Sequence, residues 1–460
     1  MDQFLRDKNR NTVLVVNTVA TRTLGAFNEA LKELEVILKR KMKVLIVVEK
    51  RDKKAQAHAK IYPKSWDIIT VNTKSVLQLE KALLPYLESI VVVECFAEKA
   101  IPFLKNIIPH IPYIETPTME SLAWSDDKIN MRRRLRAHNK KLGPAYTIIQ
   151  DSSQSAIDRI RNEVGYPAII KPAGLAASAL VRVVYDEEEA VRVIKKSLRK
   201  LRSVYHAKGY LKPPRMLIEQ YMEGDMYSTD IYVNSRGTMY TTPLVHIMTG
   251  HKAGKGDFFG YRQMTPVLMK PYKHQAAFDI AKESVIAMGL RSITAHIELM
   301  KTVNGWKIIE VNPRLGGFRE FMYQSSYGIK HTLNDLLIRL PMRPTIPRKA
   351  KGYSVVMKFY ANKEGILERI VGKQKIKKLA SYCKHDQNRH KGDKLLFARN
   401  GGSSVIDVYM FSKRRSDLLA DIHRLEQILQ IEVDSSRKPM ISFENLTDPT
   451  VEGLGAIPQG

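Results

Sequence analysis

Cysteine and long apolar runs are what this sequence lacks most clearly. Its 460 residues include two cysteines, Cys95 and Cys383, which are too few for a disulfide framework and lack the paired spacing of a zinc site. We therefore expect a reducing compartment, namely the cytoplasm. No apolar run approaches the roughly eighteen residues that cross a bilayer, and the apolar stretch after Thr12 is broken by Asn17 and Thr18. Neither a membrane span nor a signal peptide is expected.

Acidic residues are scarce relative to basic ones. The sequence has 75 Lys and Arg against 47 Asp and Glu, a formal net charge of +28. Such an excess attracts nucleic acid, a membrane surface, or phosphorylated and carboxylated small molecules, and charge alone does not choose among them. A nucleic-acid-binding protein is therefore one alternative, using the basic stretches 132–141, 195–202 and 373–378. Against it, these stretches lack interleaved aromatic residues and no nucleic-acid-binding motif accompanies them.

Short β-branched runs alternate with amphipathic helical stretches over residues 1–118. Such alternation predicts a parallel, doubly wound α/β domain. We expect strands at 12–16, 43–48, 67–71 and 90–93, with helices at 26–39, 76–86 and 99–107. The first strand is not followed by G-x-G-x-x-G, so no dinucleotide site is expected there.

The rest of the chain divides into four predicted segments. A basic linker at 119–144, one helix over 121–142, precedes an α+β unit at 145–222. An antiparallel core follows at 223–348, in which strands at 228–234 and 238–245 form one hairpin and residues 292–311 another. Residues 349–460 form a C-terminal α+β domain whose Gly- and Pro-rich tail, from 448, is flexible.

The hairpin at 292–311 is the most informative stretch. A three-residue loop, Val303 to Gly305, would place Thr302 opposite Trp306 and therefore Glu298 opposite Glu310. Alternation then puts His296, Met300, Asn312 and Arg314 on the same face, with Ile297, Leu299, Ile309 and Val311 facing the core.

Two carboxylates that face each other repel unless a cation lies between them. Glu298, Glu310 and Asn312 form an all-oxygen ligand set that suits Mg²⁺, which takes its remaining ligands from water and phosphates. Arg314 would face the same space as a cation for phosphate or carboxylate. The alternative is an ordinary amphipathic hairpin with a solvated face.

Two upstream segments add phosphate-binding chemistry. Lys171 ends a buried strand, where it needs an anionic partner unless it extends to the surface. The Gly-, Ala- and Ser-containing loop at 172–179 is small enough for backbone amides to approach phosphate, although it is not a Walker loop. The segment from Glu219 to Met222, before Glu223-Gly224, is typical of a hinge with an adenine slot, or is a plain strand end.

Together these segments resemble the ATP-grasp superfamily, and most closely its carboxylate–amine ligase branch, which includes biotin carboxylase-like and dipeptide ligase enzymes. Four motifs occur in the family's order: DDKINMR, YPAIIKPA, IEQYMEG, and the pair HIELM and EVNPR. The resemblance implies an ATP-grasp fold, with an N-terminal doubly wound domain, a lid subdomain at 145–222, a central antiparallel sheet and a small C-terminal α+β domain.

The resemblance also implies roles for individual residues. Lys128 and Lys171 would contact ATP phosphates, Glu219 would accept from the adenine amino group, and the backbone near Tyr221 and Met222 would complete the base contacts. Met300 would lie under the adenine. Glu298, Glu310 and Asn312 would hold Mg²⁺, for which Mn²⁺ substitutes, and Arg314, with Lys171, would stabilise the transferring phosphoryl group.

The chain departs from the family pattern at two places. Its loop GLAASAL has fewer glycines than the family's loop, and Met226 stands where an acid commonly contacts ribose, so Tyr227 or Asp230 would replace that contact. For the substrate, His251 in Thr249-Gly250-His251 and Arg262 are candidates, whereas Lys255 is better read as solvated. Gly316 and Gly317 would let the backbone approach substrate, or simply form a turn.

The function predicted is an ATP- and Mg²⁺-dependent ligase that joins a small-molecule carboxylate, plausibly an amino acid, to an amine through an acyl phosphate. An ATP-grasp enzyme with another acceptor, such as bicarbonate, a purine precursor or a protein tail, is the alternative. Analogy adds a homodimer through the N- and C-terminal domains.

Overall fold

The computed structural model describes residues 7–172, 181–207, 215–400 and 402–436. Two predicted features, the small-residue loop from residue 173 onward and the tail from 448, lie outside these ranges. In the described part, none of the helices combines the length and apolarity needed to cross a membrane. The described strands form four sheets.

The first sheet is parallel, as predicted, and all of its strands except the edge strand at Asp67–Val71 are buried on both faces. Its strands are β1 (Thr12–Val16), β2 (Lys43–Glu49), β3 (Asp67–Val71) and β4 (Ile90–Glu94), in the order β3-β2-β1-β4. Val13 and Val15 pack with α2 (Thr21–Leu38) and α3 (Lys53–Ala59), while Leu14 and Val16 pack with α4 (Val76–Leu83) and α5 (Ile101–Ile107). This alternation explains why the strands read as continuous apolar runs. Short 3-10 turns flank these helices at Leu84–Tyr86, Glu98–Ala100 and Ile108–His110.

The linker consists of two helices, α6 (Met119–Asp126) and α7 (Lys128–His138), so the prediction of one continuous helix is wrong. Asp127 interrupts it with an extended backbone, and its side chain accepts hydrogen bonds from the amides of Ile129 and Asn130. An aspartate that caps a helix N-terminus in this way favours a new start over continuation. The cap makes Lys128 the first residue of α7.

The lid (residues 145–222) contains an antiparallel sheet of β5 (Tyr146–Ile149), β6 (Ala168–Pro172), β7 (Arg182–Val184) and β8 (Met216–Gln220), in the order β5-β8-β6-β7. The helices α8 (Gln154–Glu163) and α9 (Glu187–Ala207) cover one face, where Ile170 and Ile218 are buried. Strand alternation therefore sends Ile169, Lys171, Leu217 and Glu219 to the other face. On α9, Lys195, Lys196 and Arg199 are exposed opposite a buried apolar stripe, so they form a solvated helix face.

The central sheet is antiparallel and runs β14-β13-β9-β11-β12-β15-β19-β17, with β10 paired to β9. Its first strands are β9 (Asp225–Val233), β10 (Met239–Thr241), β11 (Val245–Thr249), β12 (Gly260–Thr265), β13 (Ile293–Thr302) and β14 (Gly305–Asn312). The predicted strand over 238–245 is thus two strands, because Pro243 between them cannot donate to a ladder. The helices of this region are α10 (Pro271–Met288), α11 (Arg319–Tyr327) and α12 (His331–Arg339).

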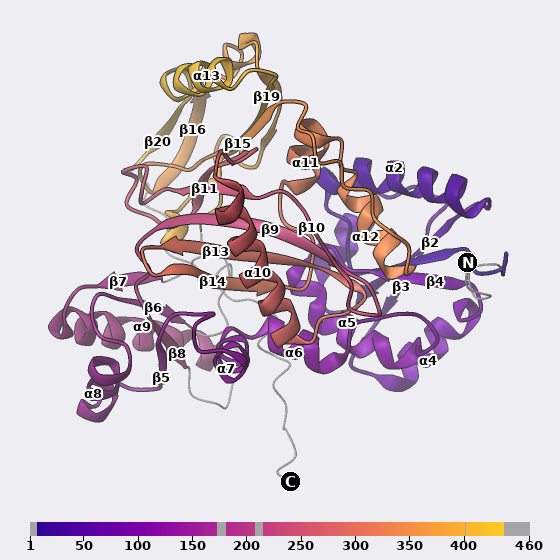
Figure 1. Cartoon of the computed structure of the whole chain (residues 1–460), viewed down its shortest axis with the longest axis horizontal. Coiled ribbons are helices and arrows are strands. Elements are labelled where there is room, and N and C mark those ends of the chain that lie inside the picture. Colours follow the sequence, from indigo (N-terminus) through magenta and orange to yellow (C-terminus); the bar gives the residue numbers. More distant parts are fainter. Residues whose placement is uncertain (1–6, 173–180, 208–214, 401, 437–460) are drawn as a thin grey trace.

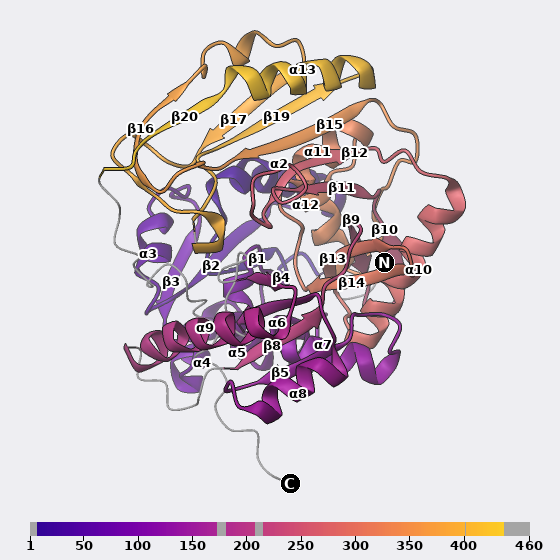
Figure 2. The same ribbon diagram turned by 90° about the vertical axis from the view of Figure 1, so that its left-hand side faces the viewer.

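The C-terminal residues continue this sheet. The strands β15 (Tyr353–Phe359), β19 (Ile406–Ser412) and β17 (Tyr382–Gln387) extend it, while β18 (Lys394–Leu395), β16 (Gly365–Val371) and β20 (Gln430–Asp434) form a separate small sheet. The helix α13 (Arg415–Ile428) packs on β19. The remaining 3-10 turns are Ile376–Lys378 and Ala398–Asn400. Figures 1 and 2 place the lid and the C-terminal strands at opposite ends of the molecule, with β9, β11 and β13 between them.

Candidate active site

A cavity of about 460 Å³ lies where the lid, α7 and the β13–β14 hairpin meet. The lid contributes Ile169, Lys171, Leu217 and Glu219, the four side chains that alternation sends away from its helices. Ten of the predicted site residues line this cavity: Lys128, Lys171, Glu219, Tyr221, Met222, His251, Glu298, Met300, Glu310 and Arg314. The lid and the hairpin therefore supply opposite walls of one space.

Glu298 and Glu310 are paired directly opposite each other, as predicted, but the hairpin reaches this register by a different route. Its turn is shorter than expected, because Thr302 pairs with Gly305 and Lys301 with Trp306. A β-bulge in β14 then shifts the register by one residue, because Leu299 pairs with Ile308 but Glu298 pairs with Glu310, which leaves Ile309 as the extra residue. As a result Ile308 is in the core and Ile309 lines the cavity, so the prediction that Ile309 faces the core is wrong.

The facing carboxylates are surrounded by cationic groups. Lys128 Nζ lies 2.9 Å from Glu310 Oε1, and His296 Nε2 lies 3.7 Å from Glu298 Oε1. Burial alone would raise the pKa of Glu310, but Lys128, followed by Lys171 and Arg314, holds it well below its ordinary value. Glu310 is therefore ionised at neutral pH and available as a ligand.

On the lid side, Glu219 lies between two cations. Its Oε2 is 2.6 Å from Lys171 Nζ, and its Oε1 accepts from Nε of Arg132. Although burial alone would raise the pKa of Glu219, Arg132 and Lys171 lower it to about 2. Lys171 thus has the anionic partner that its position at a strand end requires. The predicted contact of Glu219 with adenine remains a prediction, and pairing with these two cations is an additional role.

Arg132 is a site residue that was not predicted, because it lies in the basic stretch 132–141, whose composition indicates a solvated surface. Its side chain is only 1% exposed and lines the cavity. A signal for this was present, since Arg132 lies three residues from both Ile129 and Leu135, two buried residues of α7, and so shares their face. The stretch 132–141 therefore presents fewer surface cations than its composition suggests.

Arg314 is held by a residue from the N-terminal domain. Its Nη2 lies 2.6 Å from Glu98 Oε2, and its Nη1 donates to the carbonyl of Leu315 at 3.0 Å. Burial alone would lower the pKa of the Arg314 guanidinium, but Glu98, then Glu310 and Glu298, raises it. Glu98 was also missed, although it follows the carboxyl end of β4, the edge at which parallel sheets place binding residues.

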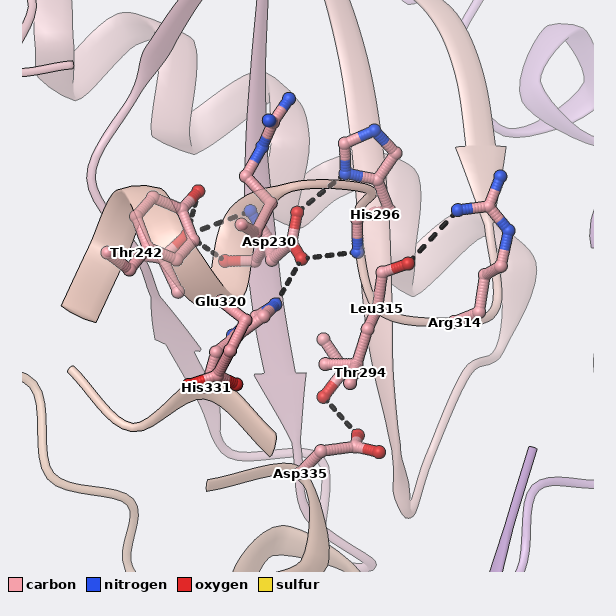
Figure 3. A network of polar contacts seen from close by, with 12 residues as sticks. Asp230, Thr242, Thr294, His296, Arg314, Leu315, Glu320, His331 and Asp335 are labelled. Carbon is pink, nitrogen blue, oxygen red and sulfur yellow. Dashed lines mark hydrogen bonds and ion pairs between the residues drawn. The ribbon is translucent and has the colours of Figure 1, made fainter. Parts of the chain in front are cut away.

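The buried carboxylate of Asp230 binds a side chain of the hairpin and the segment that follows it. Asp230 accepts from Nδ1 of His296 at 2.6 Å, from Nε2 of His331 at 2.7 Å and from the amide of Gly316 at 2.7 Å. Figure 3 shows Asp230 between the two imidazoles. A Cβ on Gly316 would lie 2.4 Å from Nδ1 of His296, so glycine is required at this position for close packing.

Six predicted site residues do not line the cavity, and one of them is Asp230, which is fully buried and so does not make the ribose contact. Tyr227 packs against Trp306 with ring centroids 5.1 Å apart, on the sheet face opposite Met226, so it cannot replace the ribose contact. Arg262 lines a second hollow beside α13, on the other side of the sheet. Gly316 binds Asp230, and the carbonyl of Gly317 accepts from Arg319. Asn312 pairs with His296 and is 3% exposed.

The side chains in the cavity wall suit a divalent cation whose other ligands are phosphate oxygens. The described part of the chain has no cluster of three or more His, Cys, Asp or Glu side chains that could hold a metal alone. The wall offers two opposed carboxylates, and the surrounding Lys128, Lys171 and Arg314 favour a polyanion. Asn312, two residues beyond Glu310 in the chain, is buried and does not line the wall. Such an incomplete all-oxygen set matches Mg²⁺, which commonly takes its other ligands from substrate phosphates.

Comparison with known proteins finds a matching domain model and a matching fold. Residues 164–320 match the family model of the ATP-grasp domain. The solved L-amino acid ligase from Bacillus licheniformis superposes with a TM-score of 0.71 at 16% identity, covering 92% of this chain and 99% of that one. The predicted ATP-grasp fold is thereby confirmed.

Two curated relatives match over shorter stretches. The uncharacterized protein y4rH of Sinorhizobium fredii is 23% identical over 56% of this chain and 50% of its own length. Carnosine synthase 1 of Homo sapiens is 22% identical over 44% of this chain and 25% of its own length. The chain thus spans half or less of the length of these relatives.

Proposed function

We propose that this chain, an ATP-grasp protein by its matching domain and its fold, is an ATP- and Mg²⁺-dependent ligase that joins a small-molecule carboxylate to an amine. The observation that carries the proposal is the pair Glu298 and Glu310, which face each other in the wall of a cavity that also contains Lys128, Lys171 and Arg314. The match to an L-amino acid ligase fold supports an amino acid as the carboxylate or the amine.

Each part of the cavity suits one part of the nucleotide. Tyr221 and Met222, at the end of β8, together with Met300 offer apolar surface and backbone for a base. Lys128 and Lys171 face the hairpin carboxylates and would bind the phosphates. Glu298 and Glu310, with Asn312 two residues further along the chain, would hold Mg²⁺, which neutralises charge on the phosphates, and Mn²⁺ would substitute for it.

The proposed reaction activates the carboxylate first. The substrate carboxylate attacks the γ-phosphorus of ATP, ADP leaves, and an acyl phosphate forms. The amine then displaces phosphate and loses a proton, which yields an amide. Arg314, with Lys171, would stabilise charge on the transferring phosphoryl group, and catalysis would be mainly positioning and electrostatics. The lid supplies one wall of the cavity, so its closure would exclude water that hydrolyses the acyl phosphate.

The test is ATP turnover in the presence of pooled amino acids and amines, followed as ADP and phosphate with and without Mg²⁺. We expect at least one pool to stimulate ADP release in the presence of Mg²⁺ and amide to form in equal amount. If bicarbonate alone stimulates turnover, the acceptor differs and the carboxylate–amine assignment is wrong. If no pool stimulates turnover, the ligase proposal fails.

A further inference from the structure

Arg132 is bound on all three of its nitrogens by groups from two other elements. Nε donates to Oε1 of Glu219 in β8, Nη1 donates to the carbonyl of Ile308 at 3.1 Å, and Nη2 donates to the carbonyl of Ile309 at 2.8 Å. The side chain is 1% exposed, so these contacts are made away from water. One guanidinium therefore ties α7, the lid and the hairpin together.

The two carbonyls that Arg132 binds belong to successive residues. In a regular strand, successive carbonyls point to opposite edges, so a single guanidinium cannot bind both. The bulge at this point of β14 changes those directions. Because β14 is the terminal strand of the central sheet, the carbonyls that point outward there have no further strand to bind. Arg132 supplies the hydrogen-bond donors for the two carbonyls at the bulge.

The same bulge decides where Glu310 points. From the turn to Leu299 the paired residue numbers sum to 607, as in Thr302 with Gly305 and Leu299 with Ile308, whereas Glu298 pairs with Glu310 at a sum of 608. If the first register continued, Glu298 would face Ile309 and Glu310 would lie on the core side, since a shift of one residue exchanges the two faces. The bulge is therefore what brings the second carboxylate into the cavity.

We propose that Arg132 is a positioning residue for this carboxylate pair: it holds the β14 bulge that turns Glu310 toward Glu298, and through Glu219 it couples that bulge to the lid. The metal-binding consequence rests on the proposed function, whereas the effect on the bulge does not. Loss of Arg132 removes a donor from the carbonyls of Ile308 and Ile309 and from the buried carboxylate of Glu219, so the bulge loses its stabilisation.

The chain offers a matched control in Arg134, two residues further along α7. Its Nε donates to the carbonyl of Ala287 at 2.9 Å, and its guanidinium stacks on Trp124 at 4.2 Å from the ring centroid. Arg134 also binds a backbone carbonyl of another element, but it does not line the cavity. A variant at this position shows how the loss of an arginine from α7 affects the protein when the contacts to the bulge remain intact.

The test compares the full-length wild type with Arg132→Met, Arg132→Lys and Arg134→Met. Amide hydrogen exchange, measured without nucleotide, should accelerate in β14 and β8 by about tenfold or more in Arg132→Met and remain unchanged there in Arg134→Met. The Mg²⁺ concentration that half-saturates ADP binding should rise by about tenfold in Arg132→Met. Arg132→Lys should give intermediate values, because lysine pairs with Glu219 but does not reproduce the fork.

Unchanged exchange in β14 of Arg132→Met, or an equal acceleration throughout the protein in Arg134→Met, would overturn the role of Arg132. If Arg132→Met does not fold, Arg132→Lys decides, since wild-type exchange and wild-type Mg²⁺ dependence in that variant would exclude a need for the fork. A wild type without Mg²⁺-dependent ADP binding would instead refute the proposed function, and the exchange data would still test Arg132.

Discussion

Lys128 Nζ lies 2.9 Å from Glu310 Oε1 in the wall of the cavity. The first residue of a helix is thereby set against a carboxylate of the facing hairpin, and this placement depends on Asp127, which interrupts the linker and caps α7. The contact has two consequences. It keeps Glu310 ionised in a half-buried position, and it puts a cation beside the carboxylate pair, where nucleotide phosphates would bind in the proposed enzyme.

The first prediction concerns this cation. In Lys128→Met, the pKa of Glu310 rises, because burial raises it and the largest opposing interaction is removed. The acidic limb of the pH profile for Mg²⁺-dependent ATP turnover should therefore move to higher pH.

Lys252→Met is the control for this variant. Lys252 also lines the cavity, but it pairs with Asp225. The acidic limb of the pH profile of Lys252→Met should coincide with that of the wild type. Equal displacement of the limb in both variants would show that Lys128 has no particular effect on Glu310.

The second prediction concerns Arg314. Arg314→Lys keeps the charge but loses the planar fork, so kcat should fall by about 10–100-fold while KM for ATP changes much less. Steady-state kinetics with ATP varied separately from the carboxylate would measure both constants. A wild-type kcat in this variant would remove Arg314 from the phosphoryl-transfer step.

The third prediction concerns Asp230 and pH. The folded pKa of Asp230 lies well below its ordinary 3.8, so its stabilisation is present above that value and is lost as pH falls through the folded pKa. Burial alone would lower the pKa of His296, but Asp230 raises the pKa of His296 above 6.5. The stabilisation that comes from protonated His296 is therefore complete below pH 6.5 and is lost as pH rises through the folded pKa of His296.

Asp230→Asn should therefore destabilise the protein most between about pH 4 and 6.5, by about 3–5 kcal/mol, and less in more alkaline solution. Chemical unfolding over this pH range measures the difference. Asp225→Asn, which breaks a pair at the surface, should cost less than about 1 kcal/mol at every pH. A pH-independent difference for Asp230→Asn would contradict the assigned pairing with His296.

The fourth prediction uses adjacent glycines. Gly316→Ala would put its Cβ 2.4 Å from Nδ1 of His296 and 2.8 Å from Oδ1 of Asp230, so it should destabilise the protein by about 1–3 kcal/mol. Gly317→Ala meets no atom within 4 Å and should be nearly neutral. Thermal unfolding of the two variants checks this, and equal melting temperatures would show that the packing around Gly316 is not tight.

Alternation along the strands predicted that Glu298 faces Glu310, and the position of Lys171 at the end of a buried strand predicted an anionic partner; both are found in the structure. Alternation could not predict the bulge in β14, since the turn that sets the register is one residue shorter than expected and the compensating shift leaves no sequence signal. Glu298 still faces Glu310, because the two errors cancel.

Residues that meet across domains were harder to predict. Arg132 lies in a run of basic residues whose composition indicates a surface, and only its helical spacing from Ile129 and Leu135 marks it as buried. Glu98 joins Arg314 through tertiary packing of the N-terminal domain, 216 residues away in sequence. Arg262 lies on the face of β12 that turns away from the cavity, and which face meets the cavity is set by the pairing of β12 with β11 rather than by the sequence of β12 alone.

The most direct test of the account is calorimetric titration of ATP into the wild type and Glu310→Ala, each with and without Mg²⁺. We expect the wild type to bind ATP at least about tenfold more tightly with Mg²⁺, a gain of about 1.4 kcal/mol, and Glu310→Ala to lose that gain while retaining its fold. Equal Mg²⁺-dependent affinity in the two proteins, or no ATP binding by the wild type, would contradict the claim that the opposed glutamates form a magnesium-nucleotide site.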